Sequence, residues 1–437
     1  MRSLADWLDY QQRIHPRAIE LGLDRVREVW IRLGSPKPAR TVVTIGGTNG
    51  KGSTVAFLEA ILRAGGHRVG AYTSPHLLRY NERVRIDAAD VDDARLVDAF
   101  ERIEAARGEI ALTYFEYGTL AALLLFADAG LDVALLEVGL GGRLDAVNII
   151  DADAAIVTTI DLDHQDWLGN DRDSIGREKA GIFRNDRPAI VGENDPPRGL
   201  LDEAARVGAV LSLAGRDFHV HVRSQDWTWR APGVDLSLPH PHLSAPCQHA
   251  NAASAITALH ALRDRIAWKE DAIARGVASA SVDARLQRFA SAPELVVDVA
   301  HNPQAARVLA EALRESRGVG RTWAVFGALS DKDIGGIVEP LSGLVDVWHL
   351  AALDGDSPRG HSAVAIRAEV LRALPDADVA DAHADVASAL EAAFAAANPG
   401  DRVIAFGSFF VAAAALAFAK AQRFATREVP TRATGRV

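Results

Sequence analysis

The chain has 437 residues, more than one hydrophobic core usually supports, so we expect two domains. Its 49% hydrophobic and 24% charged residues are typical of a soluble globular protein, while the net charge of −10 and the lack of a basic run argue against a nucleic-acid binder. Cys247 is the only cysteine, which excludes an intrachain disulfide and argues against a cysteine-based zinc site.

The sequence gives no sign of a membrane or secretory segment. The N-terminal residues up to Trp7 include Asp6 and lack the apolar stretch of a signal peptide. The longest apolar runs, 120–126 and 409–419, are too short to span a bilayer. We therefore expect a cytoplasmic enzyme without membrane or nucleic-acid partners.

Strand-like and helix-like segments alternate through the first two thirds of the chain, which predicts a parallel sheet with helices on both faces. We expect strands at 41–45, 68–72, 133–138, 155–160 and 189–191, and helices at 92–106, 114–129 and 174–183. Residues 218–238 alternate in polarity around a Pro232-Gly233 turn, which predicts a small antiparallel meander before a further helix at 250–262.

A second alternating series begins near Glu294, with strands expected at 295–299, 322–326, 345–350 and 402–406. The predicted fold class is α/β: a parallel-sheet N-terminal domain that carries the meander, and a smaller Rossmann-like C-terminal domain. We expect these domains at 1–284 and 294–425, a linker at 285–293 and a disordered tail at 426–437.

The segment Thr44–Ser53 is a glycine-rich turn between a predicted strand and a predicted helix. This arrangement binds nucleotide phosphates, because backbone N–H groups, the charge of Lys51 and the helix N-terminus all face the anion. The strict P-loop pattern is not met, since Ile45 replaces its first glycine and Gly52 separates Lys51 from Ser53. A packing turn is the alternative for this segment taken alone.

Polar residues follow three predicted strands, at the sheet edge where α/β proteins usually bind ligands. Ser74 follows the second strand, Glu137 ends the third, and Asp163-His164 follows the fourth. A carboxylate suits a magnesium ion, whereas a histidine is an unusual ligand for this hard cation. Taken singly, Glu137 could cap a loop, His164 could make ordinary hydrogen bonds and Lys179 could lie on a helix surface.

Together these motifs resemble the bacterial folylpolyglutamate synthase and dihydrofolate synthase family, relatives of the Mur ligases of cell-wall synthesis. The turn Gly47–Ser53, GTNGKGS, is the form found in ATP-dependent ligases that join an amino acid to a carboxylate. The resemblance covers nearly the whole chain, in the further segments Ile19–Leu23, Ser74–Leu77, Arg79–Arg83, Thr113–Thr119, Glu137–Asp145, Asp163–His164, Glu178–Ile182, Asp298–Pro303 and Gly407–Phe410.

The resemblance implies an ATP site and two magnesium ions. The phosphate-binding residues it implies are Thr48, Asn49, Gly50, Lys51, Gly52 and Ser53. One magnesium ion would bind Ser74 and Glu137, and the second would bind His164 and Lys179, the lysine being carbamylated in the family and so offering oxygen.

Other nucleotide contacts are implied across the interdomain cleft. Asn251 would serve the adenine side, Arg285 the transferring phosphate and Asp298 the ribose, with His301 nearby. The catalytic residues implied in this way are Lys51, His164, Lys179 and Arg285.

The resemblance also implies a pterin site. Its residues would be Ala18, Ile19, Glu20, Leu21, Thr113, Tyr114, Phe115, Glu116, Leu144, Asp145 and Ala146. Tyr114 and Phe115 suit a flat heterocycle, with a core aromatic pair on a helix as the alternative.

The implied enzyme activates a carboxylate as an acyl phosphate and couples it to L-glutamate. It would make dihydrofolate from dihydropteroate and extend tetrahydrofolate and folylpolyglutamates, and we expect it to be a monomer. Chain extension alone is one alternative, a Mur-type cell-wall ligase is another, and a nucleotide-dependent regulatory protein is a third from a different class.

The chain departs from the family pattern at a few positions. Ala284 stands where members usually carry the glycine of Pro-Gly-Arg, and Val299 replaces a glycine before His-Asn-Pro. Ala245 and Cys247 replace the usual glycine and histidine. We expect these changes to affect local backbone geometry more than activity.

Overall fold

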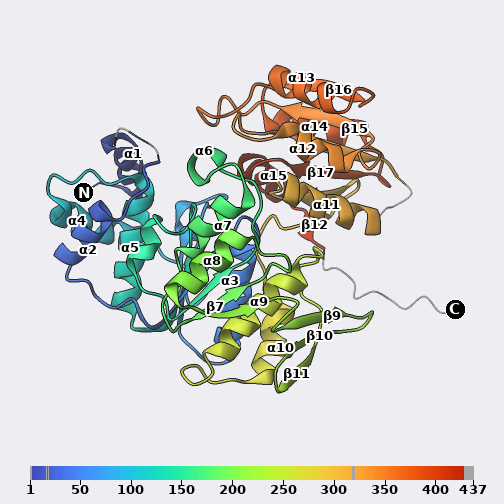
Figure 1. Ribbon diagram of the computed structural model, residues 1–437. Coiled ribbons are helices and arrows are strands. Elements are labelled where there is room, and N and C mark those ends of the chain that lie inside the picture. Colours follow the sequence, from blue (N-terminus) through green and yellow to red (C-terminus); the bar gives the residue numbers. More distant parts are fainter. Residues whose placement is uncertain (1, 16, 18, 317–319, 428–437) are drawn as a thin grey trace. The chain divides into compact units, whose positions relative to one another are not determined.

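The computed structural model describes residues 2–15, 17, 19–316 and 320–427. The chain divides into two compact units, Met1–Pro241 with His249–Ser281, and His242–Gln248 with Val282–Val437 (Figure 1). The segment expected as a linker, 285–293, contains strand β12 (Gln287–Ala290) of the second unit. Of the tail expected to be disordered, residues 428–437 lie outside the described residues.

An eight-stranded sheet forms the middle of the first unit, in the order β4-β3-β2-β5-β1-β6-β7-β8. The strands from β2 to β8 in that order run parallel, and β3 and β4 continue the sheet antiparallel. Their bounds are β1 (Ala39–Gly46), β2 (Val69–Tyr72), β3 (Val84–Ile86), β4 (Ala89–Asp90), β5 (Leu131–Glu137), β6 (Ala154–Val157), β7 (Pro188–Val191) and β8 (Val210–Leu213). Strands β1 and β5 are buried almost throughout, which explains their continuous apolar runs.

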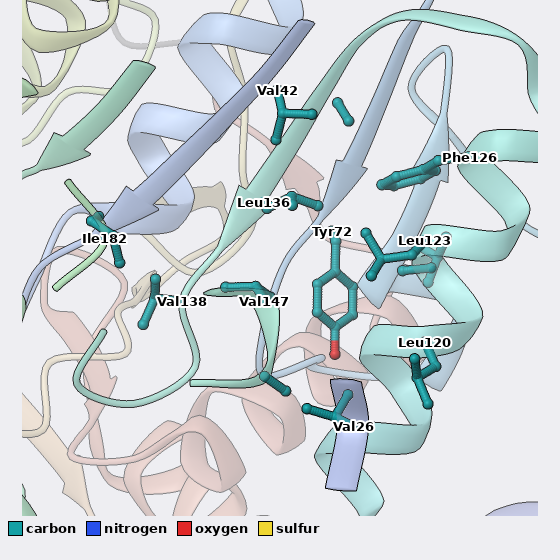
Figure 2. Packing of buried hydrophobic residues seen from close by; sticks show 14 of the residues in the cluster. Val26, Val42, Tyr72, Leu120, Leu123, Phe126, Leu136, Val138, Val147 and Ile182 are labelled. Atoms are coloured by element: carbon teal, nitrogen blue, oxygen red, sulfur yellow. The ribbon is translucent and has the colours of Figure 1, made fainter. Parts of the chain in front are cut away.

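Helices pack on this sheet, and a three-stranded antiparallel meander of order β11-β10-β9 completes the unit. Figure 2 shows Tyr72 of β2 beside Leu120 and Leu123 of α5, all in one buried cluster. The bounds are α1 (Leu4–Ile14), α2 (Asp24–Arg32), α3 (Lys51–Ala64), α4 (Asp93–Arg107), α5 (Tyr114–Ala129), α6 (Gln165–Leu168), α7 (Arg172–Ala180), α8 (Arg198–Val207), β9 (His219–Val222), β10 (Trp227–Ala231), β11 (Val234–Leu238), α9 (Gln248–Ala261) and α10 (Glu270–Ser279).

The second unit is built on a seven-stranded sheet of order β16-β15-β14-β17-β13-β12-β18. Strand β12 is antiparallel to both β13 and β18, so β18 forms this edge of the sheet. The remaining bounds are β13 (Glu294–Val297), α11 (Pro303–Glu315), β14 (Thr322–Phe326), α12 (Ile334–Val338), β15 (Val347–Ala351), α13 (Ala363–Ala373), β16 (Val379–His383), α14 (Val386–Ala396), β17 (Arg402–Phe406), α15 (Phe409–Ala421) and β18 (Ala425–Thr426).

The predicted α/β class, the meander and the second, Rossmann-like sheet are confirmed. The largest differences from the predicted element ends are two, of three residues each. Helix α7 ends at Ala180 because the amides of Ile182 and Phe183 bond carbonyls three residues back, and Ile182 is buried in the core. Strand β6 ends at Val157, since the following threonines bond the phosphate loop instead of the sheet. Within the described residues, no helix is long and apolar enough to cross a membrane.

Candidate active site at the carboxyl edge of the first sheet

The phosphate loop links β1 to α3 and depends on two glycines. Gly47 has φ 143° and Gly50 has φ 88°, backbone conformations that side chains rarely adopt. A Cβ atom on Gly47 would lie 1.9 Å from Oγ1 of Thr158, and one on Gly50 would lie 2.5 Å from Oδ1 of Asn251. The loop therefore packs against its neighbours so closely that only glycine fits, and Asn251 of α9 lies directly beside it.

Residues that follow β6 hold the phosphate loop in place through hydrogen bonds. The Thr48 amide donates to the Thr159 carbonyl at 2.7 Å, and the Asn49 amide donates to Thr159 Oγ1 at 3.0 Å. The Thr48 hydroxyl donates to the Asp161 carbonyl at 3.1 Å. These bonds hold the backbone in a preformed turn.

Lys51 opens α3, and its ammonium group lies inside the turn. Its Nζ atom donates to the carbonyls of Gly47 at 3.1 Å and Thr48 at 3.2 Å. Gly52 and Ser53 follow in the first helical turn. A lysine charge and a helix N-terminus at one loop are the features that an anion site requires.

Two further strand ends lie side by side next to the loop. Tyr72 of β2 pairs with Leu136 of β5, which places Ser74 beside Glu137. The Ser74 amide donates to Oε2 of Glu137 at 3.2 Å, and the Glu137 side chain is only 4% exposed. A buried carboxylate next to a serine hydroxyl offers the oxygen ligands that magnesium prefers.

His164 and Lys179 belong to the next part of the same edge. His164 has φ 50° and donates its amide to Asp163 Oδ1 at 2.9 Å. Lys179, on α7, is 3% exposed. Burial, with the nearby Lys51 charge as a second cause, lowers the pKa of Lys179 to about 7, and Asp163 opposes this shift. Lys51, Lys179 and Asp163 are thus close enough to interact electrostatically.

These residues fit magnesium only as part of a larger ligand set. Within the part of the chain that the structure describes, no group of three or more His, Cys, Asp or Glu side chains is arranged to hold a metal. Serine, a carbamate and nucleotide phosphates would have to supply the other oxygens. A buried amine with a pKa of about 7 is substantially neutral at pH 7, the form that reacts with carbon dioxide.

The predicted pterin segment of α5 lies over the loop after β5. Thr113 and Glu116 form the N-terminal capping box of the helix. The Phe115 ring covers Gly139, where a Cβ atom would lie 2.6 Å from Cζ of the ring. Tyr114 lies edge-on to Tyr80, with ring centroids 5.6 Å apart. Both rings are half-buried rather than core.

The loop 144–146 completes this region. Asp145 accepts hydrogen bonds from the amides of Gly139, Leu140 and Val147 at 2.9–3.0 Å. Burial raises the pKa of Asp145 to about 6, although these backbone donors oppose the rise. Ala146 is buried, and the carbonyl of Leu144 accepts the Gly22 amide at 3.3 Å.

That last bond connects the loop to the N-terminal segment containing Ile19, Glu20 and Leu21. The structure therefore brings together the three segments predicted to bind the pterin. Ala18 lies outside the described residues.

Arg285 and His301 lie against Phe409 on the second unit, and Asp298 lies near Arg285. The guanidinium carbon of Arg285 lies 5.6 Å from the Phe409 ring centroid, and the His301 ring lies 5.8 Å from it. Asp298 accepts the amides of Leu286 and Ala300, each at 2.7 Å. Burial raises the pKa of Asp298, and Arg285 opposes the rise. Both Asp298 oxygens thus already accept backbone amides, one of them next to Arg285.

Sequence reasoning missed a supporting network around Arg83. Its Nε atom donates to Nδ1 of His76 at 2.8 Å, and its guanidinium lies 5.6 Å from the Tyr114 ring centroid. Burial, followed by the Arg83 charge, lowers the pKa of His76 to about 4, so its ring is neutral at pH 7. Glu82 accepts three consecutive amides, from Leu77 to Arg79, at 2.7–2.8 Å. The motif 79–83 was visible in the sequence, but its contacts were not.

Comparison with known proteins identifies relatives over the whole chain. Residues 45–211 match the Mur ligase middle domain, and residues 284–409 match the Mur ligase, glutamate ligase domain. A dihydrofolate synthase/folylpolyglutamate synthase of Escherichia coli (strain K12) is 47% identical over 421 residues, 96% of each chain.

Solved structures give the same result. One described as E. coli FolC in complex with DHPP and ADP has a TM-score of 0.89 at 46% identity, covering 97% of this chain and 99% of that one. A bifunctional folylpolyglutamate synthase/dihydrofolate synthase with Mn, AMPPNP and L-glutamate bound has a TM-score of 0.87 at 45% identity, covering 97% and 98%.

Proposed function

The chain belongs to the dihydrofolate synthase/folylpolyglutamate synthase family, and we propose that it is an ATP-dependent ligase that joins L-glutamate to pterin-bearing acids. Its acid substrates are dihydropteroate, which yields dihydrofolate, and tetrahydrofolate and folylpolyglutamates, which are extended. The observation that carries this proposal is the edge of the first sheet: a phosphate loop with Lys51 inside it adjoins the buried Lys179 and the buried Glu137.

The reaction has two steps. A carboxylate oxygen of the acid attacks the γ-phosphorus of ATP, and the bond to the ADP oxygen breaks, which leaves an acyl phosphate. The amine of glutamate then attacks the acyl carbon, loses a proton, and displaces inorganic phosphate. Lys51 and Arg285 stabilise the charge that moves onto the phosphate oxygens. Magnesium, when bound, would neutralise further phosphate charge.

The remaining roles are proposed residue by residue. Ser74 and Glu137 would hold one magnesium ion, and His164 with carbamylated Lys179 the second. Their support is the adjacency of Ser74 to Glu137 and the lowered pKa of Lys179. Asn251, next to Gly50, would contact the nucleotide.

Asp298 and His301 are proposed to serve the nucleotide from the second unit. Both Asp298 oxygens already accept backbone amides. These bonds favour a role for Asp298 in placing Arg285 over a contact of Asp298 with the ribose. The domain limits 1–284 and 294–425, the monomeric state and a cytoplasmic location also remain proposals, the last supported by the single cysteine.

The test is phosphate release by the purified protein with Mg-ATP, L-glutamate and either dihydropteroate or tetrahydrofolate. Glutamate-dependent release with both acids is expected. Release with tetrahydrofolate alone would reduce the proposed activity to chain extension. If a folded, ATP-binding protein releases no phosphate with either acid, the proposed function is refuted. Lys51→Ala should abolish release, while Lys37→Ala, at an exposed lysine before β1, should leave it intact.

A further inference from the structure

One arginine outside the predicted site connects two of its segments. Arg25 lies in the first turns of α2, and its guanidinium reaches both Glu20 and Glu116, which are far apart in sequence. Its Nη1 atom lies 2.8 Å from Oε1 of Glu20, and its Nη2 atom lies 3.1 Å from Oε1 of Glu116. A planar guanidinium can make both contacts at once, whereas a single ammonium group cannot.

The Glu116 end of this link is buried and tightly fixed. The side chain is 3% exposed, and its Oε2 atom accepts the Thr113 amide at 2.7 Å as part of the capping box of α5. Its Oε1 atom is buried and accepts no hydrogen bond within the described residues. The positive charge of Arg25 is therefore what offsets the negative charge of this oxygen. Removing that charge would leave a buried carboxylate oxygen uncompensated.

The Glu20 end is held twice by the same side chain. Besides the ion pair, Arg25 Nη2 donates to the backbone carbonyl of Glu20 at 3.0 Å. Two residues later, the Gly22 amide donates to the Leu144 carbonyl at 3.3 Å. The segment 19–22 is therefore fixed at one end to α5 through Arg25 and at the other end to the loop 144–146.

We propose that Arg25 is a positioning residue for the pterin-bearing acid, because it holds segment 19–22 against the N-terminus of α5. This inference rests on the proposed function, which makes these segments walls of the acid site. Arg25 itself need not contact the substrate. Without Arg25, the half-buried Ile19 and Leu21 would no longer be held in place as a wall of the acid site. Binding of the acid would then weaken, while the ATP loop would stay unchanged.

The experiment compares Arg25→Lys and Arg25→Gln with Arg27→Gln. Arg27 lies on the same helix, is exposed, and has no side-chain partner within the described residues. Arg25→Lys keeps a positive charge near Glu116. It should therefore fold, and the test can be made with it even if Arg25→Gln does not fold. The readouts are kcat, the KM values for dihydropteroate, tetrahydrofolate and ATP, and the hydrogen-exchange rate of the Gly22 amide in the free protein.

Both Arg25 variants should raise the KM for each acid about tenfold, with kcat and the KM for ATP within about twofold of the parent protein. The Gly22 amide should exchange faster in both, and Arg27→Gln should change none of these values. Unchanged acid KM values, an equal rise in the KM for ATP, or unchanged Gly22 exchange would overturn the proposal. If the parent protein itself releases no phosphate with either acid, the proposed function fails, and Gly22 exchange alone decides whether Arg25 positions the segment.

Discussion

Arg285 lies between two non-glycine residues in the left-handed region, Ala284 with φ 56° and Leu286 with φ 51°. Each such residue costs about 1 kcal/mol. The turn is held in this conformation by two backbone donors: the Leu286 amide donates to Asp298, and the Ala284 amide donates to the Gln287 side chain. Ala284 therefore holds, at a cost in strain, a backbone conformation that glycine adopts readily.

Ala284→Gly should relieve that strain while losing a buried methyl group. Ala328→Gly is the matched control, because Ala328 is also fully buried in a loop of the second unit but has no positive φ. We expect the Ala284 variant to be about 1 kcal/mol more stable than the Ala328 variant in urea unfolding. If both variants lose the same free energy of unfolding, the backbone strain assigned to Ala284 is contradicted.

Lys179 is the residue whose chemistry depends most on its surroundings. Lys179→Arg keeps a positive charge but cannot form a carbamate, because a guanidinium stays protonated. Glutamate-dependent phosphate release should fall at least about a hundredfold. A carbamate signal in carbon-13 NMR with labelled bicarbonate should disappear, whereas the exposed Lys420→Arg should keep both properties. Full activity of Lys179→Arg would refute the carbamate.

At the scale of elements, the phosphate loop is shaped by how closely α9 approaches it. Gly50 and Gly66 have almost the same φ, 88° and 89°. A Cβ atom added at Gly50 would lie within 4 Å of Asn251, whereas one added at Gly66 would meet nothing within 4 Å. Alanine at either position introduces similar backbone strain. Gly50→Ala should raise the KM for ATP about tenfold or more, and Gly66→Ala should not. A similar KM in the two variants would mean that contact with α9 is unimportant.

Glu104 joins three helices of the first unit, since it accepts bonds from Tyr10 of α1, Arg107 of α4 and Tyr117 of α5. Burial raises the pKa of Glu104, but these donors outweigh it and lower the pKa from 4.5 to about 2. A lowered carboxyl pKa stabilises the fold above the unfolded value, and this stabilisation is lost as the pH falls from about 5 towards 2.

Glu104→Gln should therefore lower the free energy of unfolding by about 2 kcal/mol at pH 7, and by about 1 kcal/mol less at pH 4. Urea unfolding at both pH values measures this difference. The exposed Glu101→Gln on the same helix is the control and should change little. A pH-independent loss would show that the charge of Glu104 is not what stabilises the three helices.

At the scale of the whole molecule, each unit has its own hydrophobic core. Leu123 lies in the core of the first unit and Leu350 in that of the second, and both are fully buried. Each leucine-to-alanine change should cost about 3 kcal/mol in its own unit. In calorimetry, each variant should lower one unfolding transition and move the other little. A single transition lowered equally by both variants would contradict separate cooperative units.

Much of this architecture was predictable because it depends on local pattern. The alternation of apolar runs predicted both sheets, and the spacing of glycines and Lys51 predicted the phosphate loop. Contacts between distant segments were not predictable, such as Arg25 with Glu116 or Arg83 with the Tyr114 ring. They depend on side-chain directions that sequence periodicity does not contain. The roles of the individual site residues remain proposals for the same reason.

The pairing of β18 with β12 has a consequence for synthesis of the chain on the ribosome. The first unit is complete once residue 281 has emerged, so it can fold while the second unit is still being made. The second sheet, in contrast, gains its β18 edge only when residues 425–426 have emerged. Until then, β12 offers an open strand edge two residues after Arg285, and a newly made chain is exposed to mispairing there.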